Sequence, residues 1–121
     1  MDWYALADEE VRTVYRDLPD DLRTCLARLT VTLDSRPAPS ERSEQGDRDG
    51  LLGLFTGPGF AESEDSDMPM PAAIRLFVEN LRDEARNDPL LFRQEVRTTL
   101  LHEFGHYLGW DESDLAARGL A

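Results

Sequence analysis

The chain has 121 residues, a formal net charge of −12 and a single cysteine. This length allows one domain, which we expect to span residues 1–121. Such an acidic surface would repel a phosphate backbone, which argues against a nucleic-acid partner, and no apolar run approaches the ~20 residues that span a bilayer. The N-terminus lacks the basic and apolar layout of a secretory signal, and a lone cysteine fits a reducing compartment. We therefore expect a cytoplasmic protein without a membrane segment.

Two helices are predicted at the N-terminal end. Apolar residues at helical spacing, from Val11 to Leu18, indicate a first helix that ends before Pro19. The acidic pair that follows this proline can begin a second helix. Cys25 lies among the leucines of that second helix, so we expect a buried structural thiol rather than a nucleophile.

Three short strands are predicted, over residues 30–34, 51–56 and 73–77. The last of them is expected to lead directly into a helix at about 78–87. The segment 35–50 is rich in proline, serine, glycine and charge and is expected to be a surface loop. The acidic stretch 62–67 is predicted to be a second solvated loop, because the spacing of a calcium-binding EF-hand loop is absent.

The clearest helix is predicted to run from Pro89 to a stop at Gly109. Asp88 is a suitable N-cap, and proline at the first helical position loses no hydrogen bond. Glycine can adopt the positive φ that commonly ends a helix and turns the chain back.

The end of this helix carries His102-Glu103-Phe104-Gly105-His106, an H-E-x-x-H motif. The two histidines lie about 40° apart around the helix and one turn apart along it, so both can bind one zinc ion at ~2.0–2.1 Å. Glu103 is offset by about 100°. That offset places it near the ion without binding it, where a general base for a zinc-activated water is needed. The chain has two histidines in all, and both lie in the motif, which argues against a chance match.

A third metal ligand is expected shortly after the helix. If the chain turns back at Gly109, Glu112 can reach the ion, and the full pattern reads H-E-x-x-H-x-x-G-x-x-E. Asp111 and Asp114 are alternative oxygen donors in the same acidic stretch. Three protein ligands leave the fourth position for water, as in catalytic rather than structural zinc sites. Tyr107 can donate a hydrogen bond to an oxyanion, but packing or simple exposure is the favoured interpretation of this residue.

The stretch from Leu51 to Ala121 resembles the small bacterial zincin-like metallopeptidases, also called minimal metalloproteases. The segments that carry the resemblance are Leu52-Gly53-Leu54-Phe55-Thr56-Gly57, Ile74-Arg75-Leu76-Phe77, Val96-Arg97-Thr98-Thr99-Leu100, the run from His102 to Gly109, and Glu112. The resemblance implies a compact α+β fold in which a small mixed β-sheet packs on the active-site helix. It also implies that His102, His106 and Glu112 bind the metal and that Glu103 is the catalytic base. The larger metzincins carry a methionine turn after the motif, and no methionine follows it here, so that assignment is rejected.

The leading functional hypothesis is a zinc-dependent peptidase acting on a peptide or protein. The net charge would attract a basic substrate, but solubility is the favoured explanation of the acidity. An exposed strand edge near the helix can align an extended substrate by main-chain hydrogen bonds, and Ile74–Phe77 is the predicted edge. The alternative is a metal-stabilised interaction module that binds a basic partner through its acidic segments without significant turnover. A free Glu103 beside two histidines at ligand spacing favours the peptidase.

Overall fold

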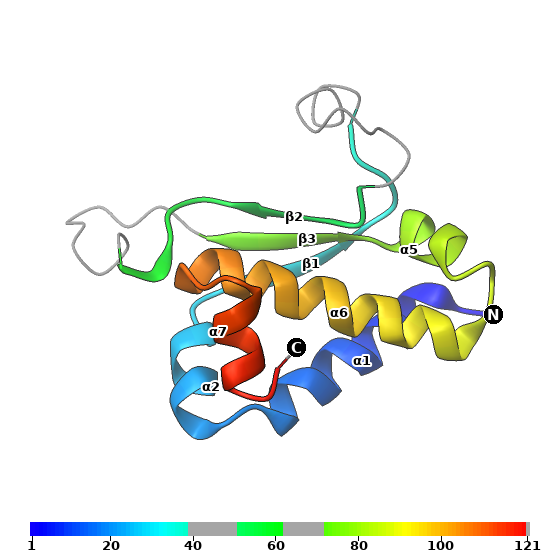
Figure 1. Ribbon diagram of the computed structural model, residues 1–121. Helices are drawn as coiled ribbons and strands as arrows, with labels where there is room; N and C mark the ends of the chain where they lie inside the picture. Colours follow the sequence, from blue (N-terminus) through cyan, green and yellow to red (C-terminus); the bar gives the residue numbers. More distant parts are fainter. Residues whose placement is uncertain (39–50, 62–71, 121) are drawn as a thin grey trace.

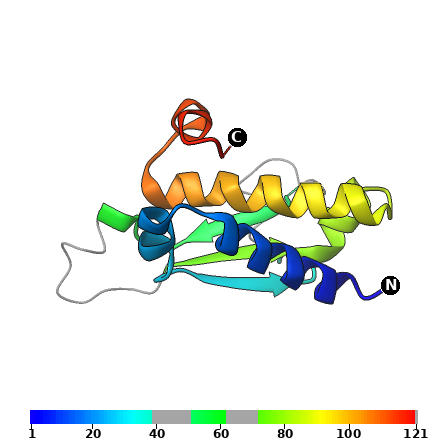
Figure 2. The same cartoon turned by 90° about the horizontal axis from the view of Figure 1, so that it is seen from below.

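The computed structural model describes residues 1–38, 51–61 and 72–120. These residues form the helices α1 (Trp3–Asp17), α2 (Asp20–Leu26), α5 (Val78–Glu84), α6 (Pro89–Leu108) and α7 (Glu112–Ala117), and the strands β1 (Thr30–Asp34), β2 (Gly53–Thr56) and β3 (Ala73–Phe77). Helices α1 and α6 lie side by side beneath one face of the sheet (Figures 1 and 2). The predicted α+β class is confirmed, whereas the predicted acidic loop at 62–67 and most of the loop at 35–50 lie outside the described residues.

The N-terminal helices begin and end where local chemistry predicts. The Asp2 side chain accepts a hydrogen bond from the Ala5 backbone amide and caps α1, which ends two residues before Pro19. On α2, Leu22 and Leu26 are buried against the core. Cys25 is only half-buried, which corrects the predicted burial: it lies at the margin of a short apolar face whose centre is the pair of leucines one turn apart.

The sheet is mixed, with the strand order β1-β3-β2. Strand β1 runs parallel to β3, and β2 runs antiparallel to it. The prediction that Ile74–Phe77 forms an exposed edge is therefore wrong, because β3 is the central strand. Ile74, Leu76 and Phe77 are all fully buried. The apolar character of β3 therefore reflects its position between two neighbouring strands and above the helices. Within the described residues, the strand edges belong to β1 and β2.

Helix α5 is shorter than the predicted 78–87 because Arg86 and Asn87 adopt positive φ angles of 54° and 62°. The left-handed backbone at these two residues ends the helix and redirects the chain into α6.

Helix α6 follows the prediction closely. The Asp88 side chain accepts hydrogen bonds from the Leu90 and Leu91 amides, and Gly109 ends the helix with φ 75°. Among its fully buried residues are Phe92, Val96 and Leu100. Among the described residues, no helix combines the length and apolar character needed to cross a membrane.

Tyr15 is expected to make stability fall at alkaline pH. Its ring packs edge-on against Phe104, and its hydroxyl donates to the Leu26 carbonyl at 3.3 Å. Burial, with a smaller contribution from Tyr107, raises the pKa of Tyr15 from 10.0 to about 12. The native state thus holds this proton more tightly than the unfolded chain, so stability is fully present below pH 10 and is lost as the pH rises towards about 12.

Denaturant unfolding on both sides of pH 10 measures this loss. Tyr15→Phe should reduce it, whereas Tyr4→Phe, at an exposed position, should leave it unchanged. An equal alkaline loss in all three proteins would contradict the assignment to Tyr15.

Candidate functional site

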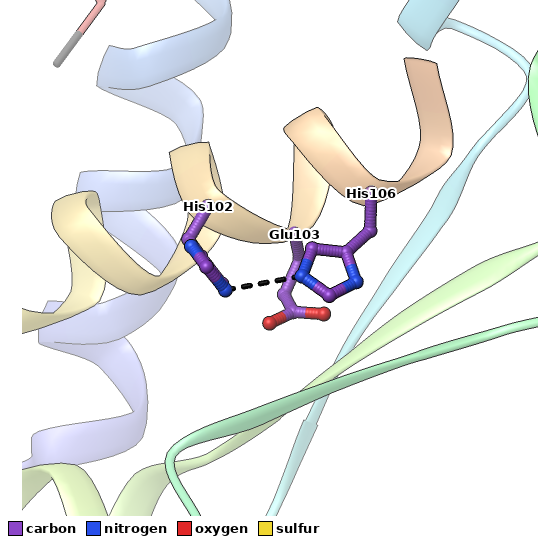
Figure 3. A group of neighbouring side chains, drawn as sticks. All are labelled: His102, Glu103 and His106. Carbon is purple, nitrogen blue, oxygen red and sulfur yellow. Dashed lines mark hydrogen bonds between the residues drawn. The ribbon is translucent and has the colours of Figure 1, made fainter. Parts of the chain in front are cut away.

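Three side chains converge near the C-terminal end of α6 (Figure 3). The potential ligand atoms of His102, Glu103 and His106 all lie within 4.8 Å of one another. The Nε2 atoms of the two histidines are 3.1 Å apart, a separation that allows both to contact one ion at ~2.0–2.1 Å. Two imidazoles with a neighbouring carboxylate are a donor set that suits zinc. The predicted motif residues therefore lie together in an arrangement that fits a metal ion.

Glu103 is the buried member of the group, with 8% of its surface exposed, whereas both histidines are exposed. Burial raises the pKa of Glu103 above its ordinary value, and the two histidines and a hydrogen bond from the Phe55 backbone amide partly oppose this rise. A carboxyl group with a raised pKa holds an abstracted proton better than a surface carboxylate does.

Glu112 lies next to His102, with its Oε1 atom 2.8 Å from His102 Nδ1. Because a carboxylate only accepts hydrogen bonds, this contact favours the proton on Nδ1 and leaves Nε2 free to bind a metal. Asp111 and Asp114, the two alternative ligands, each accept a hydrogen bond from the other's backbone amide in a capping box. Of the three acidic candidates, Glu112 is the one that contacts a motif histidine. Its role as a metal ligand stays a prediction.

Helix α7 brings Glu112 to this position and was not anticipated from the sequence. Its signal is the Asp111-x-x-Asp114 capping pattern, which lies directly after the helix stop at Gly109. The Trp110 amide donates to the Gly105 carbonyl at 2.8 Å, and Leu115 is buried. A Cβ at position 105 would lie 3.1 Å from Leu115 Cδ1 and 3.2 Å from the Trp110 carbonyl oxygen. A glycine is thus what lets α7 pack directly on α6.

The metal-binding group lies on the wall of a pocket of about 830 Å³ between α6, β2 and the C-terminal segment. The remaining lining residues are Leu51, Leu52, Gly53, Leu54, Phe55, Gln94, Glu95, Arg97, Thr98, Thr99, Leu101, Glu112 and Leu120. The pocket runs from the motif along α6 towards the start of that helix and has an apolar wall on the β2 side. Such a cavity gives a substrate direct access to the histidines and Glu103.

Comparison with protein families shows which family the chain belongs to. The model of the zincin-like metallopeptidase family matches residues 26–120. The chain belongs to the zincin-like metallopeptidase family. A comparison with curated proteins finds no significant match. The family match confirms the resemblance inferred from the motif and supports a hydrolase that binds a metal.

Two observations refine the site of this zincin-like protein. Tyr107 is 2% exposed, and its ring packs against Phe55 and Phe60 with centroid distances of 5.9 and 5.8 Å. This burial favours packing over a role in stabilising an oxyanion. Phe55, which lines the pocket together with Glu103 and packs against Tyr107, was not identified from the sequence, because no local pattern indicates which strand passes over the motif.

Gly105→Ala is expected to loosen the packing of α7 on α6 in this zincin-like protein. Because the added methyl group must displace Leu115 or the Trp110 carbonyl, we expect a loss of about 1–3 kcal/mol in the free energy of unfolding. The Glu112–His102 contact should weaken, with zinc affinity lower by ~10-fold or more. Urea unfolding and competition with a chromophoric chelator measure the two effects. Ser113→Ala, at an exposed position on α7, is the control. Unchanged stability and zinc affinity would contradict this account of the packing.

Proposed function

We propose that this chain is a zinc-dependent peptidase in which His102, His106 and Glu112 bind the metal and Glu103 is the general base. The observation that carries the proposal is a buried Glu103 beside two imidazoles at ligand spacing, on the wall of a large pocket. In a structural zinc site, protein ligands occupy all four coordination positions. Such a site requires neither an unligated carboxylate nor an accessible cavity beside the metal.

Zinc, when bound, would polarise the scissile carbonyl and lower the pKa of a bound water. Glu103 takes the proton from the attacking water and returns it to the leaving amine. Its partial isolation from solvent and the raised pKa support this exchange. Glu112 is proposed as the third ligand on the H-E-x-x-H-x-x-G-x-x-E pattern. In the structure its carboxylate contacts His102 Nδ1, so binding the metal would require the side chain to leave that atom for the Nε2 side of the histidines.

The proposed substrate is an extended peptide segment, with basic sequences favoured by the net charge of −12. Strand β2 supports this proposal, because it is an edge strand and also lines the pocket beside Glu103. An extended chain can add to such an edge by main-chain hydrogen bonds. Strand β2 thus takes the role first predicted for Ile74–Phe77, and the cytoplasmic location stays a prediction.

A digest of a broad peptide library by the purified protein tests the function. We expect cleavage that stops when a chelator removes the metal and returns when zinc is added. His102→Ala and His106→Ala should each lose both zinc and cleavage, since each removes one imidazole donor. No cleavage by protein that elemental analysis shows to be loaded with zinc would instead support the alternative of a metal-stabilised interaction module.

A further inference from the structure

One face of α6 leads from the start of the helix to the motif. Leu91, Glu95, Thr98 and His102 are spaced at i, i+4, i+7 and i+11, so they lie within about 60° of one another around the helix axis. The last three of these residues line the pocket. Leu91, which is 46% exposed, extends the same face one turn further from the metal-binding group. The pocket therefore continues along α6 well beyond the candidate metal site.

The wall of the pocket opposite this face is apolar. A Cβ at Gly53 would lie 2.7 Å from Thr99 Cγ2, and Phe55 packs against Tyr107, so β2 runs in the same direction as α6. The residues before Gly53 therefore lie towards the start of α6, where Glu95 is one turn before Thr99. The half-buried residues of this segment that line the pocket are Leu51 and Leu52.

Glu95 places a carboxylate on this part of the pocket. It is half-buried, and within the described part of the chain its carboxylate has no ion-pair or hydrogen-bond partner. The two arginines of α6 do not neutralise it. Arg93 pairs with Glu10 of α1 at 3.2 Å, and Arg97 lies about 160° from Glu95 around the helix axis. The residues one turn before and one turn after Glu95 are uncharged. The carboxylate is thus available to a cation of the substrate.

We propose that Glu95 is a specificity-determining residue that binds a lysine or arginine side chain of the peptide substrate. This inference rests on the proposed peptidase function. A basic side chain combines an aliphatic stem with a cationic head. The stem packs against the leucines of the β2 wall and against Leu91, and the head pairs with the carboxylate of Glu95.

The spacing along α6 determines where in the substrate this basic residue lies. Glu95 precedes His102 by seven residues, which places it about 10.5 Å from His102 along the helix axis. An extended peptide covers ~3.3 Å per residue. The basic residue is therefore about three positions from the cleaved bond, on the side that lies towards the start of α6.

This contact differs from attraction by the net charge. The charge of −12 acts over the whole surface and favours basic residues at every position of a substrate. A contact with Glu95 favours a basic residue at one position and depends on one carboxylate. The two effects can therefore be separated by moving a single charge along the peptide.

Cleavage of position-scanned peptides by the zinc-loaded protein tests the contact. In a peptide from the library digest, lysine is compared with N-acetyl-lysine at each position in turn, because acetylation keeps the stem and removes the charge. About three positions from the cleaved bond, lysine should give a kcat/KM ~5–10-fold higher. Glu95→Gln should abolish this difference, and Glu95→Lys should favour glutamate at the same position. Glu84→Gln, the same change at an exposed position on α5, should keep the preference for lysine.

Three outcomes would overturn the role of Glu95: an equal preference in Glu95→Gln, a preference spread evenly along the peptide, or a preference that ignores salt. A charge pair must weaken as the ionic strength rises, whereas an effect of the substitution on the fold would not follow salt. Thermal unfolding and zinc content show whether each variant is folded and loaded. If Glu95→Lys does not fold, the comparison of Glu95→Gln with Glu84→Gln decides the proposal.

Binding without turnover separates this inference from the proposed function. The probe is a dye-labelled decapeptide of alanine and threonine with one central lysine or N-acetyl-lysine, and the readout is fluorescence anisotropy with zinc-loaded Glu103→Gln. The lysine peptide should bind ~5–10-fold more tightly, and Glu95→Gln/Glu103→Gln should bind both peptides equally. If no library peptide is cleaved, the peptidase proposal fails, while this binding difference still decides whether Glu95 recognises a cation. If cleavage occurs without a preference that depends on Glu95, the specificity role alone fails.

Discussion

Glu103→Gln is expected to lower kcat by about 10²–10⁴-fold while zinc stays bound. Glutamine keeps the size of the side chain and can still accept a hydrogen bond, but it cannot take a proton from water. The measurement is kcat on a library-derived peptide together with the zinc content of the same sample. Glu84→Gln, at an exposed position on α5, is the control and should retain full activity. Full hydrolysis by zinc-loaded Glu103→Gln would reject Glu103 as the base.

The stability of Glu103→Gln would distinguish the loss of a catalytic base from damage to the fold. Burial raises the pKa of Glu103 in the native state, so the native state binds this proton more tightly than the unfolded chain does. The linkage relation then requires the contribution of Glu103 to stability to fall as the pH rises above the ordinary value of 4.5. In metal-free protein we expect Glu103→Gln to be at least as stable as the unsubstituted chain at neutral pH, with the difference shrinking towards acid. Marked destabilisation at neutral pH would contradict this reading.

Removal of the metal is expected to lower the melting temperature substantially. An ion present at ~100-fold its Kd stabilises the native state by ~2.7 kcal/mol, and a chelator removes that contribution. Acid should act in the same direction, since His102 and His106 must be neutral to bind a metal. Thermal unfolding with zinc, with a chelator and after zinc is restored measures the effect. Equal melting temperatures in the three samples would argue against a native metal site.

Amide hydrogen exchange with and without a chelator would show which part of the chain loses stability. Glu112 contacts His102, so we expect the first turn of α7 to lose protection on chelation. The rest of α7 has its own anchors: Leu115 is buried, and Arg118 donates to both carboxylate oxygens of Asp21 at 2.9 Å. Glu112→Gln should reproduce the local loss in the presence of zinc, whereas Ser113→Ala should not. Unchanged protection around position 112, with zinc demonstrably absent, would exclude Glu112 as the residue that ties this segment to the metal.

Much of the helical framework could be read from the sequence because its signals are local. Asp88 and Pro89 begin α6 and Gly109 ends it through contacts within a turn or two of the chain. The spacing of His102 and His106 needs nothing beyond helical geometry to place both imidazoles on one face. The class of the protein and the core of its candidate site follow from these local facts.

Only the tertiary structure decided which strand lies over the site. All three strands are only four or five residues long, and their pairing depends on neighbours far apart in the chain, so the sequence around each strand does not show which one lies at the centre. The same limit applies to Phe55 on the pocket wall with Glu103 and to α7 packed on Gly105, since each joins segments whose proximity is set by the packed core. The motif determines which groups can do the chemistry, and long-range packing determines what holds them in place.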